Sequence, residues 1–522
     1  MTNTATPDEQ PRQKGILGWI ERTGNALPDP VFIFFWLILG LAIFSAGAAA
    51  MGLQVLHPVQ TDETGAPLVV KAASMFDPEN IRRLLVEMPT TFTHFHPLGY
   101  VLVVMLGAGI AERTGLFGSA MRAAVKGAPT FLLTPMIAFV AMMGNLAADA
   151  AYVVLIPLAA VLYASAGRHP IAGIAAAFAG VSGGFSANLL PGQLDALLFG
   201  ITQAATESLA PWEMNIAGNW FFIAVMLFVF LPVIWFVTDR IIEPRLGPWT
   251  GGSASAIAPQ DADNPKEGRA LALAGLAGLG VIALWVFLTV GPGTPLTDTT
   301  KDDPVQRLTP LLQSLVAGFF ILFLVMGWVY GAVTGVVKGH RDIVKMMAQS
   351  MGDMAYYLVL AFAAAHFVAM FNWSNLGLIA AVNGADFLKS TNMPAPALLA
   401  SIVVMAAAVN LLVGSASAKW GLLAPVLVPM LMLLNISPEM ATAAYRVGDG
   451  ATNIVTPLMV YFPLILTFAQ RWNPQFGLGS LTATMLPYSI WILIAGLALT
   501  IGWVALDLPL GPGAGVHYTL PQ

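Results

Sequence analysis

Arg446 and Asp449 are two ionisable residues that lie three positions apart inside a long apolar run. An ionisable side chain inside a bilayer-crossing helix costs roughly 2.5–3.5 kcal/mol on insertion scales, so it needs a partner or a use. Residues three apart lie on one helix face, where the two side chains can pair. The arginine could bind an anion while the carboxylate takes a proton or Na⁺, or the two could form a purely structural ion pair.

Two more aspartates lie beside interruptions of apolar runs, Asp195 and Asp149. Burial favours the protonated form of a carboxyl group, so either aspartate could carry a proton. The alternative is that each caps a helix or faces water at the end of a span.

Four asparagines recur at the same interruptions: Asn145, Asn188, Asn410 and Asn453. Their neutral carbonyl oxygens suit a hard cation, but asparagine also caps the ends of broken helices. We therefore expect either a cation-binding or a helix-capping role at each of these positions.

The polar cluster Ser415, Ser417, Lys419 and Trp420 combines hydroxyl groups, a cation and an aromatic face. This combination suits an aromatic acid as ligand. Alternatively, Trp420 anchors the chain at the membrane surface, where tryptophan is common. Lys419 could strengthen the binding of a dicarboxylate, or its side chain could extend outward to water.

Patterns that would indicate an enzyme are present but lack their structural context. The sequence GVSGG (180–184) fits the G-x-S-x-G nucleophile motif, which needs a preceding strand, yet it lies inside an apolar run. An intramembrane aspartyl protease needs two carboxylates that share a proton, and Arg446 would instead favour the ionised form of Asp449. No Walker A loop is present, so we expect neither catalysis nor ATP-driven transport.

The composition places these residues in a membrane protein. Of the 522 residues, 57% are hydrophobic and only 10% are charged, against about 25% in an ordinary soluble domain. Cysteine is absent, which excludes a disulfide framework and cysteine-ligated metals. The net charge of −5 is small and no basic stripe indicates nucleic acid.

Apolar runs of bilayer length recur along the chain, since a helix needs about 20 residues to cross the hydrocarbon core. Two longer apolar stretches, 129–166 and 394–434, are interrupted halfway, and we predict that each forms a re-entrant hairpin lining a wet cavity. The nine predicted crossings are 31–51, 95–111, 171–205, 218–239, 270–290, 311–333, 350–371, 441–469 and 480–506. With the N-terminus inside, fifteen of the 23 Lys and Arg residues fall on the cytoplasmic side and six on the other.

The order of these parts predicts an all-α fold, with one transmembrane domain, residues 1–522, that contains an inverted repeat. Segments 95–239 and 350–506 each contain a span, a hairpin, a span interrupted by Gly and Pro, and a returning span, with opposite orientations. A cytoplasmic linker, 246–268, lies between them and is rich in Gly, Pro and Ser. Such repeats with broken helices are typical of secondary transporters that bind substrate near the midplane. A channel is the main alternative, since it would conduct without accumulating its solute.

Three separated motifs resemble those of the p-aminobenzoyl-glutamate transporter (AbgT) family, and the likeness extends over nearly the whole chain to the closing GPGA (511–514). The motifs are VSGGFSAN (181–188), GSASAKW (414–420) and YRVGDGATNIVTP (445–457). This resemblance implies a dimeric carrier in the bacterial inner membrane, with nine spans and two opposed hairpins.

The resemblance also implies a substrate and the residues that handle it. It implies cation-coupled transport of p-aminobenzoyl-glutamate or related folate-pathway compounds, or proton-driven efflux of sulfonamide antimetabolites, with Na⁺ or H⁺ as the coupling ion and no cofactor. The implied substrate-binding residues are Asp195, Ser417, Trp420, Pro438, Arg446, Asp449 and Pro457. Asn410 is implied to bind the cation, and the residue types at Asn188, Asn453 and Asp449 make them further candidate ligands.

Overall fold

The computed structural model describes most of the chain. The described residues are 29–61, 66–125, 129–147, 151–210, 212, 214–249, 266–291, 293–301, 307–456 and 458–519. Asp149, Pro457 and residues 250–265 of the predicted linker lie outside them. Helices dominate the described chain, as predicted.

The expectation of an all-α chain is wrong in one place. Strands β1 (Gln54–Thr61) and β2 (Pro67–Lys71) pair as an antiparallel hairpin ahead of helix α3 (Pro78–Thr93). The segment between the predicted crossings 31–51 and 95–111 therefore contains a small sheet as well as a helix. Pro58 interrupts the short first strand, so the sequence lacks the sustained alternation by which strands are recognised.

Seven helical segments of the described chain are long and apolar enough to cross a membrane. Each corresponds to one of the seven uninterrupted spans predicted from the sequence. The segments are Val31–Ala50, Pro78–Arg113, Trp220–Leu246, Glu267–Val290, Leu315–Thr334, Ala355–Trp373 and Leu478–Ala505. The total of nine crossings stays a prediction, because it counts each broken helix pair as one further span.

Two stretches of the chain contain seven α-helices each in the same order: a long helix, a short surface helix, two hairpin helices, two halves of a broken span and a long helix. The first stretch is α4 (His96–Arg113), α5 (Leu116–Val125), α6 (Leu133–Met143), α7 (Ile156–Ser165), α8 (Pro170–Phe178), α9 (Gln193–Thr206) and α10 (Trp220–Phe236). The second is α17 (Ala355–Trp373), α18 (Leu376–Ser390), α19 (Ala395–Asn410), α20 (Ala416–Met432), α21 (Pro438–Thr452), α22 (Phe462–Trp472) and α23 (Leu478–Ala505). Helices α5 and α18 were not predicted from the sequence, yet they make the two stretches correspond element by element.

The paired helices of each predicted hairpin are short. Helices α6 and α7 have 11 and 10 residues, and α19 and α20 have 16 and 17. At about 1.5 Å per residue none of them reaches the roughly 30 Å of a bilayer core. Their lengths favour hairpins over pairs of full crossings, while re-entrance itself stays a prediction.

The two predicted broken spans are both interrupted. After α8 and a π-helical turn, Ala179–Gly183, the chain is irregular until α9 begins at Gln193. The second interruption begins later than predicted, because α21 continues through Gly448 and Gly450 to Thr452.

The two interruptions lie against each other. A Cβ atom at Gly450 would lie 2.8 Å from the carbonyl oxygen of Gly183, so the backbones approach closely there. The side-chain amide of Asn453 donates a hydrogen bond to the carbonyl oxygen of Ser182 at 3.4 Å. A backbone carbonyl group at the first break thus accepts a hydrogen bond from a residue at the second break. Backbone polar groups away from water need such partners inside the protein.

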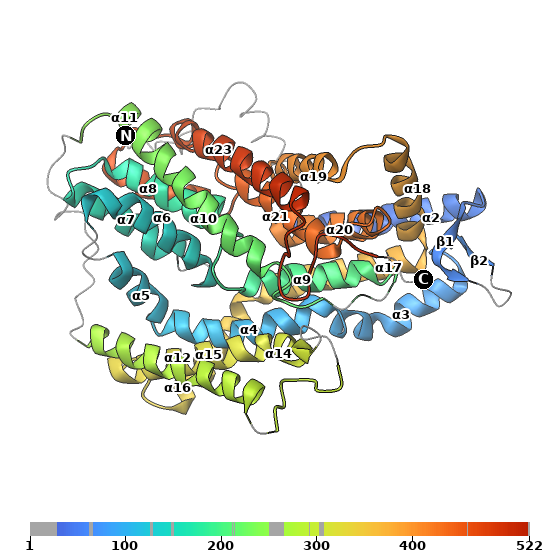
Figure 1. Ribbon diagram of the computed structural model, residues 1–522, viewed down its shortest axis with the longest axis horizontal. Helices are drawn as coiled ribbons and strands as arrows, with labels where there is room; N and C mark the ends of the chain where they lie inside the picture. Colours follow the sequence, from blue (N-terminus) through green and yellow to red (C-terminus); the bar gives the residue numbers. More distant parts are fainter. Residues whose placement is uncertain are drawn as a thin grey trace, which may run out of the picture.

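The remaining helices surround this centre. Helices α4, α12 (Glu267–Val290), α15 (Leu315–Thr334) and α16 (His340–Asp353) pack together along one long side of the molecule (Figure 1). Helices α10 and α23 pack against each other on the opposite side, and α9, α20 and α21 lie between the two sides. The remaining elements are the long helix α2 (Pro30–Ala50) and the short elements η1 (Thr130–Leu132), η2 (Gly144–Ala147), η3 (Ala151–Leu155), η5 (Val237–Ile242), α11 (Glu243–Leu246) and α14 (Thr309–Gln313).

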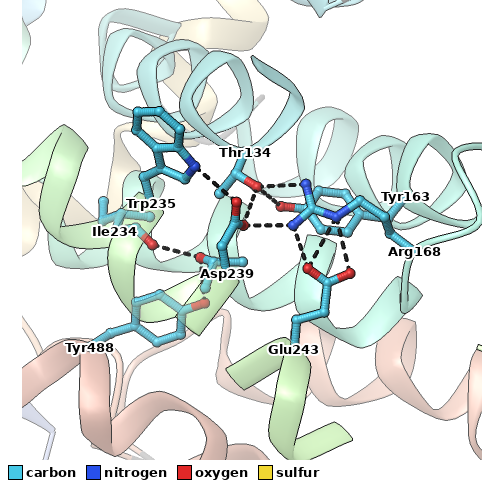
Figure 2. A network of polar contacts seen from close by, with 9 residues as sticks. Thr134, Tyr163, Arg168, Ile234, Trp235, Asp239, Glu243 and Tyr488 are labelled. Carbon is cyan, nitrogen blue, oxygen red and sulfur yellow. Dashed lines mark hydrogen bonds and ion pairs between the residues drawn. The ribbon is translucent and has the colours of Figure 1, made fainter. Parts of the chain in front are cut away.

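A polar network fixes the first hairpin to the end of α10. Arg168, in the loop between α7 and α8, pairs with Asp239 at 2.6 Å and with Glu243, and it donates to Thr134 at 2.9 Å (Figure 2). Its guanidinium also lies over the ring of Tyr163, 4.4 Å from the centroid. One arginine thereby links residues of α6, α7, η5 and α11 at the end of this bundle.

Gly448 is the position where α21 comes closest to α19, and we predict that Gly448→Ala destabilises the protein. The added Cβ would lie 2.1 Å from the carbonyl oxygen of Val403, so the helices must separate. Overpacking of this kind costs typically about 1–3 kcal/mol. A lower unfolding temperature in detergent would reveal the loss.

The matched control is Gly280→Ala in α12, where nothing lies within 4 Å of the added atom. Alanine there should leave stability unchanged or raise it by up to about 1 kcal/mol, because glycine is the weaker helix former. Equal melting temperatures for the two variants would contradict the close approach of α19 and α21.

Candidate functional site

One face of α21 carries a stripe of polar residues through the centre of the molecule. Its members alternate three and four positions apart, so they share a helix face. They are Glu439, Thr442, Arg446, Asp449 and, directly after the helix, Asn453. All five are buried. The stripe begins beside the buried Pro438, the first residue of the helix, where the hydroxyl of Ser437 accepts a hydrogen bond from the amide of Met440 at 3.1 Å.

Arg446 pairs with Asp195 of α9, and not with Asp449, which was one of the two alternatives that the sequence left open. The side chains of Arg446 and Asp195 are 2% and 8% exposed, so the pair is shielded from water. The other carboxylate oxygen of Asp195 accepts the amide of Gly192 at 2.7 Å, which adds the capping role that the sequence left open. Arg446 and Asp449 do not pair with each other because neighbouring helices supply an opposite charge to each of these two residues.

Asp449 finds its own partner on the second hairpin. The ammonium group of Lys419 in α20 lies 2.5 Å from Asp449 Oδ1, and both side chains are 2% exposed or less. Lys419 also donates a hydrogen bond to the side-chain oxygen of Asn410. Lys419 therefore points inward in this structure and does not extend toward water.

The predicted cation ligands Asn410, Asn453 and Asp449 lie together, but their oxygens have other partners. The Asn410 amide donates to Asn453 Oδ1 at 2.9 Å, and its own oxygen, like Asp449 Oδ1, contacts the ammonium of Lys419. Asn188 belongs to a separate group, in which its amide donates to the carbonyl oxygen of Met142 at 3.3 Å. Asn410, Asn453 and Asp449 do not fit a Na⁺ ion, because the ammonium group of Lys419 occupies the place where the oxygens of Asp449 and Asn410 meet.

The predicted aromatic face, Trp420, is covered. Its ring stacks on Tyr445 with centroids 4.4 Å apart, and its indole nitrogen donates to the hydroxyl of Thr202 at 2.8 Å. Trp420 is fully buried, so it does not serve as an anchor at the membrane surface. Ser417 lies one turn before it and shares a hydrogen bond of 3.3 Å with Ser415, the N-cap of α20.

A cavity of about 380 Å³ lies beside the start of the stripe, between α4, α9, α15 and the segment before α10. It falls in the usual range for small-molecule sites, about 300–1,000 Å³. Its lining residues are Tyr100, Phe199, Gln203, Met214, Asn215, Ile216, Leu312, Gln313 and Val316. Four of these also line a small space of about 10 Å³ that contains Asp195, Glu439 and Arg446. The cavity thus adjoins the buried arginine.

The structure brings together most of the predicted site residues and adds several that were not predicted. Asp195 and Arg446 line the space next to the cavity, whereas Trp420 and Asp449 are buried in helix contacts and Ser417 is half-buried. The residues not predicted are Thr202, Gln203, Glu439, Thr442 and Tyr445. The alternating spacing of polar residues from 439 to 453 is a sequence signal that would have identified Glu439 and Thr442.

A mostly helical membrane chain with two broken helices and buried charges where they meet has the architecture of a secondary transporter. The chain belongs to the AbgT putative transporter family, whose model matches residues 15–518. It is 34% identical over 499 residues to the p-aminobenzoyl-glutamate transport protein of Escherichia coli K12, covering 95% of this chain and 96% of that protein.

Two solved structures have the same fold. One is the YdaH transporter of Alcanivorax borkumensis, described as having an unusual topology, with 41% identity, a TM-score of 0.86, and coverage of 93% of this chain and 100% of that one. The other is MtrF of Neisseria gonorrhoeae, described within a class of antimetabolite efflux pumps, with 42% identity, a TM-score of 0.88, and coverage of 96% and 100%. The protein is therefore a membrane transporter and not an enzyme.

The buried pair of Lys419 and Asp449 gives a stability prediction. Lys419→Met leaves the Asp449 carboxylate buried without a counter-ion, which should cost about 3–5 kcal/mol. The double variant Lys419→Met/Asp449→Asn removes both charges and should recover most of that loss. Thermal unfolding of the purified proteins measures both effects.

The exposed pair of Lys389 and Asp386, whose atoms are 3.9 Å apart, provides the control. Lys389→Met should change stability by less than about 1 kcal/mol, since such surface pairs contribute little. Equal losses for the two lysine variants, or a double variant less stable than Lys419→Met, would contradict the buried pairing.

Proposed function

We propose that the protein is a secondary active transporter that moves p-aminobenzoyl-glutamate or related aromatic folate-pathway compounds across the bacterial inner membrane. The observation that carries the proposal is the buried Arg446–Asp195 pair beside a cavity of small-molecule size. The full-length likeness to the E. coli p-aminobenzoyl-glutamate transport protein supports this substrate class. We further propose that the carrier works as a homodimer and that 95–239 and 350–506 act as its two opposed repeats.

The cavity offers complementary groups for such a ligand. Tyr100 and Phe199 meet edge to face, with centroids 5.3 Å apart, and give an aromatic wall for a benzoyl ring. Gln203 and Asn215 provide amide groups at its lining. Arg446 can bind a carboxylate at the inner end, and its Nε has no partner among the described residues. Binding would require the ligand to share or replace Asp195 on the guanidinium.

We propose a cation as the driving ion, and the arrangement around Lys419 favours H⁺ over Na⁺. The ammonium group already neutralises Asp449 and contacts the oxygen of Asn410. A Na⁺ ion at these residues would have to displace a tethered positive charge from a dry site, which is unfavourable. A proton needs no ligand cage and requires only a carboxyl group that can take it up.

Proton-driven efflux of sulfonamide antimetabolites is the second candidate. It is favoured by the likeness to MtrF, which is described among antimetabolite efflux pumps. The same aromatic wall would suit the benzene ring of a sulfonamide. Uptake and efflux differ in the direction of net movement and in whether protons move with or against the substrate.

Reconstitution in liposomes tests the class and the coupling ion together. With labelled p-aminobenzoyl-glutamate outside, we expect accumulation when a proton gradient alone is imposed and none with a Na⁺ gradient alone. Accumulation under the Na⁺ gradient would overturn the choice of ion. Absence of both accumulation and substrate exchange would count against a carrier of this substrate, and conduction without saturation would indicate a channel.

Removal of the central charges should abolish transport. Arg446→Ala deletes the proposed carboxylate-binding group, and Asp449→Ala leaves Lys419 buried without its counter-ion. We expect loss of uptake in both variants, and size-exclusion chromatography in detergent checks that the fold persists. Arg83→Ala, which breaks an exposed pair with Glu87, is the control and should transport normally. Normal gradient-driven transport by Asp449→Ala would remove that residue from the mechanism.

A further inference from the structure

Glu439 is a buried carboxyl group that has no cationic partner among the residues that the structure describes. It is the second residue of α21, and its side chain is almost fully buried, with 3% of the residue exposed. One oxygen accepts a hydrogen bond from the indole nitrogen of Trp212 at 3.1 Å. The other oxygen has no hydrogen-bond partner among the described residues. Glu439 thus differs from the two aspartates of the site, each of which pairs with a basic side chain.

The charged groups around Glu439 do not compensate a negative charge there. On its own helix and on α9, the titratable groups that line the same small space are Arg446 and Asp195, which neutralise each other. From the C-terminal segment, Tyr518 packs edge-on against Trp212 with centroids 5.0 Å apart. Burial of an unpaired carboxylate in such surroundings is disfavoured, which favours the protonated form of Glu439 in this conformation.

Glu439 also has a route to water. The space of about 10 Å³ that it shares with Asp195 and Arg446 is the size of roughly one water molecule. This space adjoins the cavity of about 380 Å³ through shared lining residues, including Asn215. A proton can therefore pass between Glu439 and water in the proposed substrate cavity.

We propose that Glu439 is the site that binds and releases the coupling proton of the transport cycle. The inference rests on the proposed function and deepens it by naming the proton-binding group. Its carboxylate takes a proton from water on one side of the membrane and returns the same proton to water on the other. No other bond forms or breaks.

Proximity to Arg446 would link this proton to the substrate. While Glu439 is protonated, Asp195 is the carboxylate that a substrate must share or replace on Arg446, whereas ionised Glu439 would bring a second negative charge into the small shared space. Like charges in a dry site repel strongly, so proton and anionic substrate should bind together. The affinity for the substrate should then fall as the pH rises.

The test uses Glu439→Gln in the full-length carrier, reconstituted in liposomes, because glutamine resembles the protonated acid in shape and charge. We expect exchange of labelled for unlabelled p-aminobenzoyl-glutamate to continue, while accumulation driven by a pH gradient is lost. Substrate binding should weaken with rising pH in the wild type and stay constant in the variant. Glu79→Gln, an exposed glutamate in the first turn of α3, is the control and should behave as the wild type.

Each outcome decides one of the two ideas. Wild-type-like accumulation or an unchanged pH dependence of binding in Glu439→Gln would overturn the proton-binding role while leaving the transporter proposal intact. Loss of exchange in the variant, at a wild-type melting temperature, would also overturn it, since the neutral form must still cycle. Failure of the wild type itself to exchange or accumulate would instead defeat the proposed function.

Discussion

A charge buried in α21 must meet an opposite charge on a neighbouring helix, and the centre of the molecule is arranged around this requirement. Arg446 meets a carboxylate from α9, and Asp449 meets an ammonium group from α20. Helix α21 supplies the basic member of the first pair and the acidic member of the second, both from one helix face. Breaking either would leave an uncompensated ion at a cost of about 3–5 kcal/mol, so the pairs fix which helices lie beside α21.

The first of these pairs joins the two halves of the chain. Asp195 comes from the first stretch of seven helices and Arg446 from the second, and the hydroxyls of Thr202 and Thr442 connect the same two helices at 2.9 Å. Trp420 then links α20 to α9 through Thr202. A ligand that competes for Arg446 would therefore disturb a contact between the halves. That is the relation between binding and rearrangement which alternating access requires.

The sequence was sufficient to predict the parts of the structure that depend on local pattern. Bilayer-length apolar runs predicted the seven uninterrupted spans, and the Gly and Pro clusters predicted both broken helices. The amphipathic helices α5 and α18 were missed because a short surface helix next to a span looks like its continuation or a loop. The hairpin of β1 and β2 was missed because Pro58 interrupts the pattern of its first strand.

Part of the candidate site's membership was predictable from the sequence, but its pairing was not. Asp195, Trp420, Arg446 and Asp449 were identified because buried ionisable and aromatic groups beside breaks are expensive and rare. Spacing along one helix cannot show which neighbour supplies the counter-charge, so a pair of Arg446 with Asp449 was one of the alternatives left open. The inward direction of Lys419 depends on how α20 packs against α21, and no local pattern contains that information.

The contrast between paired and unpaired carboxyl groups at this site indicates that the two kinds of group have different roles. Asp195 and Asp449 each lie against a basic side chain. Glu439 accepts a hydrogen bond from an indole and has no basic side chain paired with it among the described residues. A transporter driven by protons needs an unpaired carboxyl group such as Glu439. It also needs paired carboxyl groups such as Asp195, because an arginine without a partner would hold an anionic substrate too tightly to release it.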